Sequence, residues 1–502
     1  MRPAALAAIV MLCSLLGGAS AASAGTYQVG ACNRAPADQN NSWQPFDEDS
    51  AHMLTGHVCP PLSGEGEQAK TTGLFASDSL TGTGNAASGA SAGWRFTAPA
   101  GMTIVAVQAD RYLGAYGDNG WVPSISADGT RLETCTFNFP AEQCKVGEPF
   151  GNVNSLGGVL PVANASTLSV GITCTGPGGC VPGATIHHAW AALYGASVTL
   201  NETTDPSLLG VAGQLWGPGP ADGFHRGVES VTFAAADPSG ISQTTLLVDG
   251  RGAAAQAGVC DYTYPIPCQG LAGTLNLDTT QLADGPHTLT LAAYDAAQNE
   301  VQLTHQITVD NGAPAAPGAL SATRALDGSD TVTWSDPPHV APITQVNYEL
   351  CPLAGGACRA PLSTPNLERL TGIRPPPGRW QVKLWLTDQI GNVNPANAAA
   401  ASLPASLVLH LHRRLRGRQL TVWAVVPSGV SGRVTIGYRA QRGTHTLTHG
   451  QREAKVRRHR AQILIHLSKQ AAGSVGRLYL TARADYALPA SLDVALPHQV
   501  RK

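Results

Sequence analysis

Two stretches of similar pattern decide the fold class: DGPHTLTLAAYDAAQN at residues 284–299 and PGRWQVKLWLTDQIGN at residues 377–392. In each, a Gly-containing turn precedes a run in which apolar and polar residues alternate, and a D-x-x-x-N sequence ends the run. Alternation with a period of two residues is typical of a β-strand with one face in a core. The stretches therefore predict equivalent strands in two related β-modules.

The same alternation recurs along the chain, and helical periodicity is nearly absent. Short alternating runs bounded by Gly, Pro, Asn and Asp occupy residues 103–108, 244–248, 287–292, 381–386, 420–426 and 433–440. This pattern predicts an all-β protein of tandem β-sandwiches. Pro-containing linkers near residues 201–207, 309–317 and 403–405 divide it into blocks 25–202, 203–311, 312–404 and 405–502.

The D-x-x-x-N turns have two interpretations. An Asp or Asn side chain can hydrogen-bond its own backbone and close the turn. The same residues could ligate calcium, but the sequence shows no further carboxylates clustered around them. We therefore expect no metal and no cofactor.

The first 24 residues have the pattern of a signal peptide. Arg2 gives a positive start, residues 4–16 are an apolar run too short to span a bilayer, and Ala22-Ser23-Ala24 has the form of a cleavage site. Cys13 follows Leu12, which argues against a lipid anchor at this cysteine. No later segment has 18 uninterrupted apolar residues. We expect an exported protein without a transmembrane segment, either extracellular or associated with the cell surface.

The ten cysteines that remain after the signal peptide fall in neighbouring couples. Zinc sites usually need closely spaced ligand pairs such as CxxC, and none occurs here. In an oxidising compartment the local spacing favours five disulfides. The expected couples are Cys32/Cys59, Cys135/Cys144, Cys174/Cys180, Cys260/Cys268 and Cys351/Cys358.

Three blocks resemble known module families. In block 312–404, TVTWSDP at 331–337, NYEL at 347–350 and the strand from Trp380 to Asp388 resemble a fibronectin type III module, although Cys351 and Cys358 depart from that family. Block 203–311 resembles bacterial immunoglobulin-like repeats through DGPHTLT and ITVD at 307–310. Block 25–202 is similar to lectin-like jelly rolls. These families imply spacers and binding scaffolds, but a fold does not locate a site.

The catalytic motifs in the first block are weak. GASAG at 89–93 has the letters of a nucleophile elbow, but no helix pattern follows it. A jelly-roll glycosidase would need paired carboxylates on one strand, and the contiguous Asp47, Glu48 and Asp49 favour a solvated turn. The pair His52/His57 and the neighbours His187 and His188 favour structural roles over a metal site. We assign no catalytic residue.

Two residue sets are candidate binding sites. Tyr112, Tyr116 and Trp121 lie in a predicted Gly- and Asn-rich loop with Arg111, Asp118 and Asn119, where aromatic faces could stack on sugar rings. Rings that cap the sandwich core are the alternative. The second set lies in block 405–502 and comprises Arg452, Lys455, Arg457, Arg458 and Arg460.

The charge of the chain is divided unequally between its blocks. The formal net charge of −2 excludes a uniformly basic protein, but residues 405–502 hold 17 Lys and Arg against 3 Asp and Glu. Arg433, Arg439, Arg477 and Arg483 alternate with apolar residues, which predicts a cationic face opposite a core face. Such a face attracts polyanions, and a purely solubilising face is the alternative.

These observations favour a non-enzymatic, secreted or surface-associated binding protein. The first block would bind a glycan, and the basic block would retain the protein at an anionic envelope polymer or surface. We expect no specific nucleic-acid partner. An extracellular carbohydrate-active enzyme with a jelly-roll catalytic domain and a purely structural envelope protein remain alternatives, and the sequence does not indicate an oligomeric state.

Overall fold

A computed structural model describes residues 25–32, 40–62, 66–117, 119–135, 143–149, 159–218, 223–324, 329–376, 378–404, 408–410, 415–416, 418–426, 432–467, 476–484 and 490–495. The signal peptide predicted at residues 1–24 lies outside these ranges. The chain divides into two compact units. The first unit holds the first sandwich and most of the second, and the second unit holds residues 218–228, 278–286 and 308–502.

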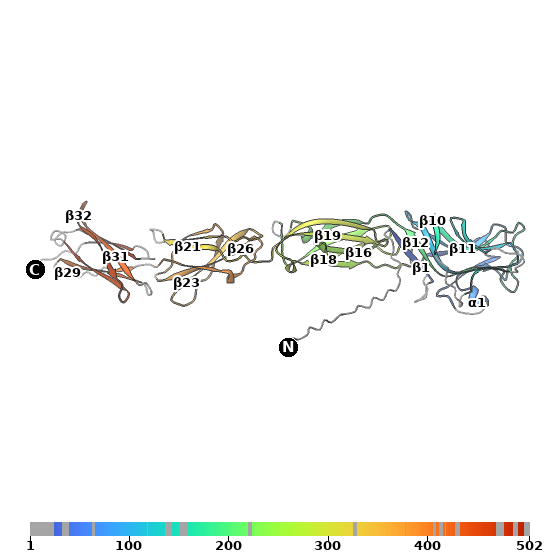
Figure 1. Ribbon diagram of the computed structural model, residues 1–502, viewed down its shortest axis with the longest axis horizontal. Helices are drawn as coiled ribbons and strands as arrows, with labels where there is room; N and C mark the ends of the chain where they lie inside the picture. The colour runs from blue at the N-terminus through green and yellow to red at the C-terminus, as the bar shows by residue number, and fades with distance from the viewer. Residues whose placement is uncertain are drawn as a thin grey trace, which may run out of the picture. The chain divides into compact units, whose positions relative to one another are not determined.

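The first sandwich occupies the block 25–202 and consists of two antiparallel sheets (Figure 1). One sheet has the order β10-β6-β12-β4-β3, with β1 also paired to β12 and β9 to β6. Its strands are β1 (Thr26–Ala31), β3 (Met53–Val58), β4 (Gly73–Asp78), β6 (Thr103–Tyr116), β9 (Gln143–Gly147), β10 (Leu160–Ala165) and β12 (Ala189–Asn201). The other sheet consists of β2 (Trp43–Asp47), β5 (Ser91–Thr97), β11 (Thr167–Cys174), β7 (Trp121–Ala127) and β8 (Thr130–Thr134), in this order.

Alternation places the core of this sandwich between the sheets. In β5, Trp94 and Phe96 are buried while Arg95 is exposed, because successive side chains point to opposite faces. Trp43 of β2 pairs with Phe96 of β5, and their rings pack edge to face with ring centroids 5.8 Å apart. The helix α1 (Glu67–Lys70) lies beside the outer face of the first sheet, where it contacts aromatic residues of β6 and β12.

The second sandwich has a three-stranded and a five-stranded sheet. The first consists of β13 (Ser207–Ala212), β15 (Val228–Ala236) and β18 (Leu271–Asp278). The second contains β20 (Glu300–Val309), β19 (Gly285–Asp295), β16 (Ile241–Val248) and β17 (Arg251–Ala257), and β14 (Phe224–His225) runs parallel to the last two residues of β20. Short 3-10 turns span Gln214–Trp216 and Thr279–Gln281.

Polar and apolar contacts join the first and second sandwiches within the first unit. The hydroxyl of Tyr27 donates to the carbonyl oxygen of Pro265 at 2.6 Å, and the amide of Gly25 donates to the carbonyl oxygen of Ala297 at 3.0 Å. Ala297 and Cys268 are buried in one cluster with the core of the first sandwich. Burial and neighbouring carboxylates raise the pKa of Tyr27, so its hydroxyl remains a donor.

The third sandwich packs two sheets around Val332, Trp334, Val346, Leu384 and Leu386. One sheet has β21 (Gly318–Arg324), β22 (Asp330–Ser335) and β25 (Arg369–Ile373), and the other has β24 (Leu362–Pro365), β23 (Ile343–Pro352), β26 (Trp380–Asp388) and β27 (Ala399–Ser402). A 3-10 turn spans Pro395–Asn397. Trp334 on the second strand and Tyr348 on the third occupy the positions that the fibronectin type III resemblance implies.

The fourth sandwich is built from hairpins. One sheet contains β28 (Val408–His410), β29 (Leu415–Arg416), β30 (Gln419–Val425) and β33 (Arg460–His466), with β33 paired to β30. The other has the order β32 (His445–Lys455), β31 (Arg433–Arg442), β34 (Arg477–Ala484) and β35 (Ala490–Ala495). Val434, Ile436, Leu478 and Leu480 are buried, and the arginines between them are exposed. The predicted division into a core face and a cationic face is confirmed.

The all-β prediction is confirmed, and among the described residues strands pair only inside each of the four blocks. All five predicted disulfides are present: Cys32–Cys59, Cys135–Cys144, Cys174–Cys180, Cys260–Cys268 and Cys351–Cys358. No helix in the described part of the chain is long and apolar enough to cross a membrane. The jelly-roll topology of the first block stays a prediction.

Candidate functional site

Four of the five predicted polyanion-binding residues line one open hollow on the fourth sandwich. Lys455 ends β32, Arg457 and Arg458 lie in the following turn, and Arg460 begins β33. The hollow has a volume of about 780 Å³, and Glu453, Ala454 and Gln462 complete its lining. Because β32 and β33 are edge strands of different sheets, the turn between them lies at an edge of the sandwich. We call this feature the cationic edge.

The turn at the cationic edge has an unusual backbone. Arg457 and Arg460 exchange both backbone hydrogen bonds, at 2.8 and 3.0 Å, so that two residues lie between them. Those residues, Arg458 and His459, have φ angles of 49° and 66°. Positive φ at both central positions is the type I′ pattern, which Asn-Gly satisfies with the least strain. Backbone strain of this kind is often found at functional sites.

Few acidic groups neutralise the cationic edge. Glu453, the carboxylate in its lining, pairs with Arg433 at 3.0 Å. The guanidinium of Arg460 lies 5.8 Å from the ring centre of Trp423. Within the described ranges, Lys455, Arg457 and Arg458 form no ion pair, and all three are exposed. Cations gathered in this way repel one another. A polyanion in contact with them offsets this repulsion and is therefore attracted to the cationic edge.

Arg452 is exposed but does not line the hollow. It lies three residues before Lys455 on β32, and an odd separation along a strand places side chains on opposite faces. The strand register agrees, because Arg452 pairs with the core residue Ile436 while Lys455 pairs with Arg433. The structure thus brings four members of the predicted set together and leaves Arg452 on the other face.

The predicted glycan-binding loop of the first sandwich is not a loop. Tyr112 and Tyr116 belong to β6, which continues well beyond the predicted run at 103–108, and Trp121 begins β7. Tyr112 and Trp121 are only 1% and 2% exposed, so neither ring face is available at the surface. A Cβ added at Gly114 would lie 2.6 Å from the Tyr112 hydroxyl oxygen, so this glycine makes room for a packed ring.

The polar members of that set also have structural partners. Arg111 forms a two-point ion pair with Glu133 of β8. The side-chain amide of Asn119 donates to the carbonyl oxygen of Tyr116 at 2.8 Å, and the indole of Trp121 donates to the carbonyl oxygen of Val181 at 2.9 Å. Asp118 lies outside the described residues. Glycan binding by this set stays a prediction, and the burial of its rings does not support it.

The sequence analysis did not predict a buried lysine, Lys70, whose side chain lies between α1 and the sheet that contains β6 and β12. Lys70 of α1 is 9% exposed, and its ammonium lies 4.0 Å from the ring centre of Trp190 and 5.1 Å from that of Tyr116. Glu67 pairs with Lys70 at 3.2 Å and accepts a hydrogen bond from the Trp190 indole. Burial raises the pKa of neighbouring Tyr112 to about 12. The contacts of Lys70 are those of a cation held in an aromatic setting.

The weak motifs of the first sandwich have structural roles. Ser91 begins β5 within a sheet, where its hydroxyl donates to Glu48 at 2.9 Å, so it does not lie on a strand-to-helix elbow. Buried Asp78 accepts backbone hydrogen bonds from Gly183, His188 and Ala189. His187 contacts the backbone carbonyl of Asp78. These contacts fasten the segment before β12 to the end of β4.

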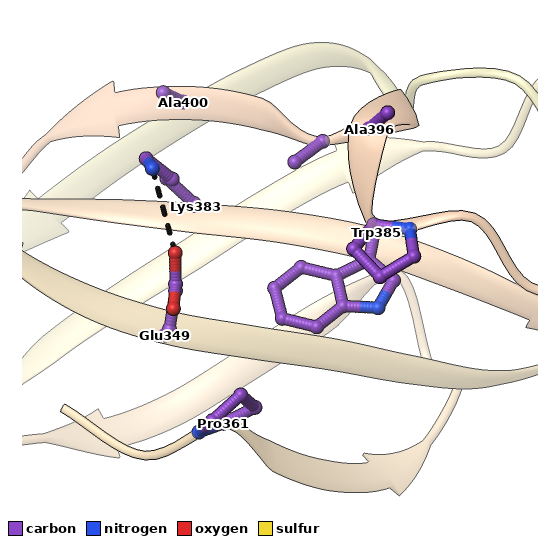
Figure 2. Close-up of a pocket in the computed structure, with 8 residues that line it drawn as sticks. Glu349, Pro361, Lys383, Trp385, Ala396 and Ala400 are labelled. Carbon is purple, nitrogen blue, oxygen red and sulfur yellow. Dashed lines mark ion pairs between the residues drawn. The ribbon is translucent and has the colours of Figure 1, made fainter. Parts of the chain in front are cut away.

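A smaller hollow of about 400 Å³ lies on the third sandwich (Figure 2). Lys383 and Trp385 alternate on β26 with core residues, so they face outward, and Lys383 pairs with Glu349 of β23 at 3.4 Å. Pro395 and Ala396 of the 3-10 turn cover Trp385, which is 7% exposed. The ion pair neutralises the two charges in the lining, and most of the remaining lining residues are apolar.

No protein-family model and no curated protein matches the chain. Solved structures similar to it include the FN1–FN3 domains of chicken CNTN1 (12% identity, 58% of this chain and 97% of that one, TM-score 0.21). A tetra-tandem repeat in the extending region of a large adhesion protein matches at 16% identity over 83% of this chain and 97% of that one (TM-score 0.26). Fibronectin(III)-like modules of Clostridium thermocellum CbhA match at 11% identity over 39% and 90% (TM-score 0.19). At these values the likeness concerns the β-sandwich fold alone.

Proposed function

We propose that the protein is a non-enzymatic, extracellular modular binding protein whose fourth sandwich binds a repeating anionic polymer. The observation that carries the proposal is the cationic edge, where Lys455, Arg457 and Arg458 line one hollow without an ion pair among the described residues. A chain of regularly spaced anions can contact several of these cations at once. The first three sandwiches then act as spacer modules, and the five disulfides fit an oxidising compartment.

The charge distribution supports electrostatic retention at an anionic surface. The last block has 17 basic and 3 acidic residues, whereas the chain as a whole has a formal charge of −2. A uniformly acidic protein would be repelled by an anionic polymer, so one basic end orients the molecule toward it. Binding of this kind weakens as salt is added, because exposed charges are screened over about 8 Å at physiological ionic strength.

The test uses the full-length protein and heparin as the anionic polysaccharide probe. We compare the wild type with the triple variant Lys455→Gln, Arg457→Gln and Arg458→Gln by titration at two salt concentrations. Each cation near an anionic surface contributes about 1 kcal/mol, so the variant is expected to lose affinity on the order of 100-fold. Its dependence on salt should also become shallower.

The matched control is Arg439→Gln, Arg442→Gln and Arg483→Gln, which removes the same charge from outside the lining of the hollow. If the cationic edge is the site, this control keeps most of the affinity. Equal losses in both triple variants would show that net charge alone attracts the polymer, and the assignment to the cationic edge would be wrong.

A further inference from the structure

Two clusters of carboxylate and histidine side chains in this chain have the same construction, each with two buried residues and one partly buried residue. In the second unit, Asp310 follows β20, Asp388 ends β26, and His339 lies in the loop after β22. In the first unit, Glu202 follows β12, Asp295 ends β19, and Asp237 follows β15. Each cluster therefore joins a residue at the end of one sandwich block to residues at or after strand ends of the next block.

The D-x-x-x-N turns make the correspondence close. The side-chain amide of Asn392 donates to the backbone carbonyl oxygen of Asp310 at 2.9 Å. The side-chain amide of Asn299 donates to the backbone carbonyl oxygen of Glu202 at 3.1 Å. In both turns the backbone N–H of the Asn donates to the Asp at 2.8 Å. The two clusters thus share one framework and differ in the third residue.

In the second unit, the third residue supplies a nitrogen between the carboxylates. Nε2 of His339 lies 3.1 Å from Asp310 Oδ2 and 3.0 Å from Asp388 Oδ2. Both carboxylates are buried, at 0% and 2% exposure. The imidazole nitrogen at this position gives both buried carboxylates a polar partner inside the protein, which a buried polar or charged group needs. The second cluster therefore has a nitrogen partner for both carboxylates, although Asp310 Oδ1 has no hydrogen-bond partner among the described residues.

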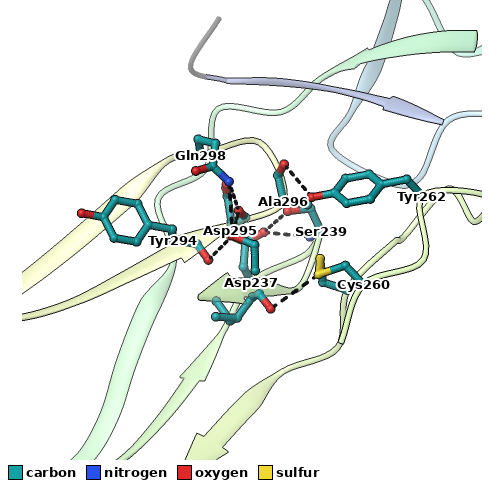
Figure 3. The surroundings of a disulfide bond; sticks show 11 residues. Asp237, Ser239, Cys260, Tyr262, Tyr294, Asp295, Ala296 and Gln298 are labelled. Carbon is teal, nitrogen blue, oxygen red and sulfur yellow. Dashed lines mark hydrogen bonds between the residues drawn. A yellow bond between two sulfur atoms is a disulfide. The ribbon is translucent and has the colours of Figure 1, made fainter. Parts of the chain in front are cut away.

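In the first unit, the corresponding residue is a third carboxylate. Glu202 and Asp295 are 1% and 0% exposed, and Asp237 lies beside Asp295 near the Cys260–Cys268 disulfide (Figure 3). Ser239 donates to Asp237 Oδ1 through its amide and its hydroxyl, both at 2.7 Å. The other oxygen, Asp237 Oδ2, is sealed from solvent and has no hydrogen-bond partner. Among the described residues, no Lys, Arg or His pairs with this cluster.

We propose that a divalent cation of the calcium class binds among Glu202, Asp237 and Asp295, in the place that the His339 imidazole holds in the second unit. The three carboxylates offer oxygens within 4.8 Å of one another. Calcium contacts oxygen at about 2.3–2.6 Å, so one ion can reach oxygens up to about 5 Å apart. A hard cation suits this all-oxygen set, whereas zinc and copper favour nitrogen and sulfur.

The position of the site gives the ion a structural role. The side-chain amide of Asn299 donates to both Glu202 and Asp295, and the amide of Gly25 donates to the carbonyl oxygen of Ala297 within the same turn. An ion in the cluster would therefore fasten the end of the first sandwich block to the second sandwich. This inference concerns the joint between modules and is independent of the cationic edge.

The experiment uses the full-length protein in metal-free buffer at pH 7.5, with CaCl2 as the probe. Isothermal titration should detect binding in the range of about 10⁻⁴–10⁻³ M that extracellular modules show. Saturating calcium should raise the melting temperature of the first unit by about 2–8 °C. Absence of both heat and melting shift up to about 10 mM calcium would overturn the proposal.

Two variants test the comparison between the clusters. Asp237→Asn should weaken calcium binding about tenfold or more, since it removes one of three carboxylates. Asp237→His copies the second cluster, so it should raise the melting temperature without calcium and abolish the response to calcium. The control is Asp205→Asn, which replaces an exposed carboxylate three residues after Glu202. This variant should bind calcium and shift its melting temperature like the wild type. A wild-type calcium response in Asp237→His would also overturn the proposal, and this arm does not depend on the stability of Asp237→Asn.

Discussion

The side-chain amide of Asn392 hydrogen-bonds the backbone carbonyl oxygen of Asp310 at 2.9 Å, and so ties the turn after β26 to the residue after β20. Arg226 donates to the Oδ1 atom of the same Asn392 at 3.0 Å. Asn392 is only 9% exposed and Asp310 is 0% exposed, so this hydrogen bond lies in a buried setting, whereas Arg226 is exposed. The Asn392 amide thus joins polar groups from three separate segments of the second unit.

Truncation of this amide should destabilise the second unit. We expect Asn392→Ala to lower the free energy of unfolding by about 1–3 kcal/mol, because it leaves the Asp310 carbonyl oxygen buried without this donor. Urea denaturation followed by tryptophan fluorescence measures the change. Gln345→Ala on an exposed position of β23 is the control and should stay within about 0.5 kcal/mol of the wild type. Equal stability of both variants would contradict this role of Asn392.

A substitution that removes the backbone strain at His459 should stabilise the fourth sandwich and keep all four cations of the cationic edge. His459 has a φ angle of 66°, which glycine adopts without steric cost. We expect His459→Gly to raise the free energy of unfolding by about 1 kcal/mol and to leave heparin affinity within about twofold. Replacement of Arg458-His459 by Asn-Gly should stabilise the turn further but weaken binding, since it also removes the Arg458 charge. A loss of affinity in His459→Gly alone would show that His459 itself contacts the polymer.

Stability of the first unit should depend on pH through Asp295. Burial, followed by the hydrogen bond with Glu202, raises the pKa of Asp295 from 3.8 to about 7. The folded state therefore holds this proton more tightly than the unfolded state, and the stability that it contributes is lost as the pH rises from about 4 to 7. Melting curves in metal-free buffer should show this decrease, and Asp295→Asn should flatten it. A melting temperature that rises across this window would contradict the assignment.

The disulfides should differ in their accessibility to reductant. Cys174 and Cys180 are both 0% exposed, whereas Cys358 is partly exposed and its partner Cys351 is 3% exposed. Under native conditions, mild reduction followed by alkylation and mass spectrometry should label Cys351 and Cys358 well before Cys174 and Cys180. The rates should become equal in denaturant, which serves as the control. Equal rates in the folded protein would show that local opening, and not burial, limits the reaction.

Much of the fold follows from short-range patterns. The alternation at 433–440 identifies both the buried and the exposed residues of β31, because a strand reverses its side chains at every step. The cysteine couples are separated by only 6–27 residues, so their pairing can be predicted from spacing. The four cations of the cationic edge lie within six consecutive residues and were predicted for the same reason.

Other features depend on contacts between distant residues. The glycines at 114 and 117 suggested a loop, but Gly114 makes room for the Tyr112 ring inside a long strand. The position of Lys70 over Trp190 requires α1 to cover the outer face of a sheet, which no local pattern shows. Glu202, Asp237 and Asp295 come from three strand ends, so their sequence neighbours do not reveal that they meet.

The short loops closed by four of the disulfides have a consequence for the protein under tension. Cys260–Cys268 and Cys351–Cys358 enclose separations of only 8 and 7 residues, and the pairs Cys135–Cys144 and Cys174–Cys180 enclose 9 and 6. An extended chain spans at most about 3.5 Å per residue, so each of these bonds withholds only about 20–30 Å of contour length. A pulled molecule therefore releases nearly the whole length of the second and third sandwiches with their cysteine pairs intact, whereas Cys32–Cys59 withholds a longer segment of 27 residues in the first sandwich.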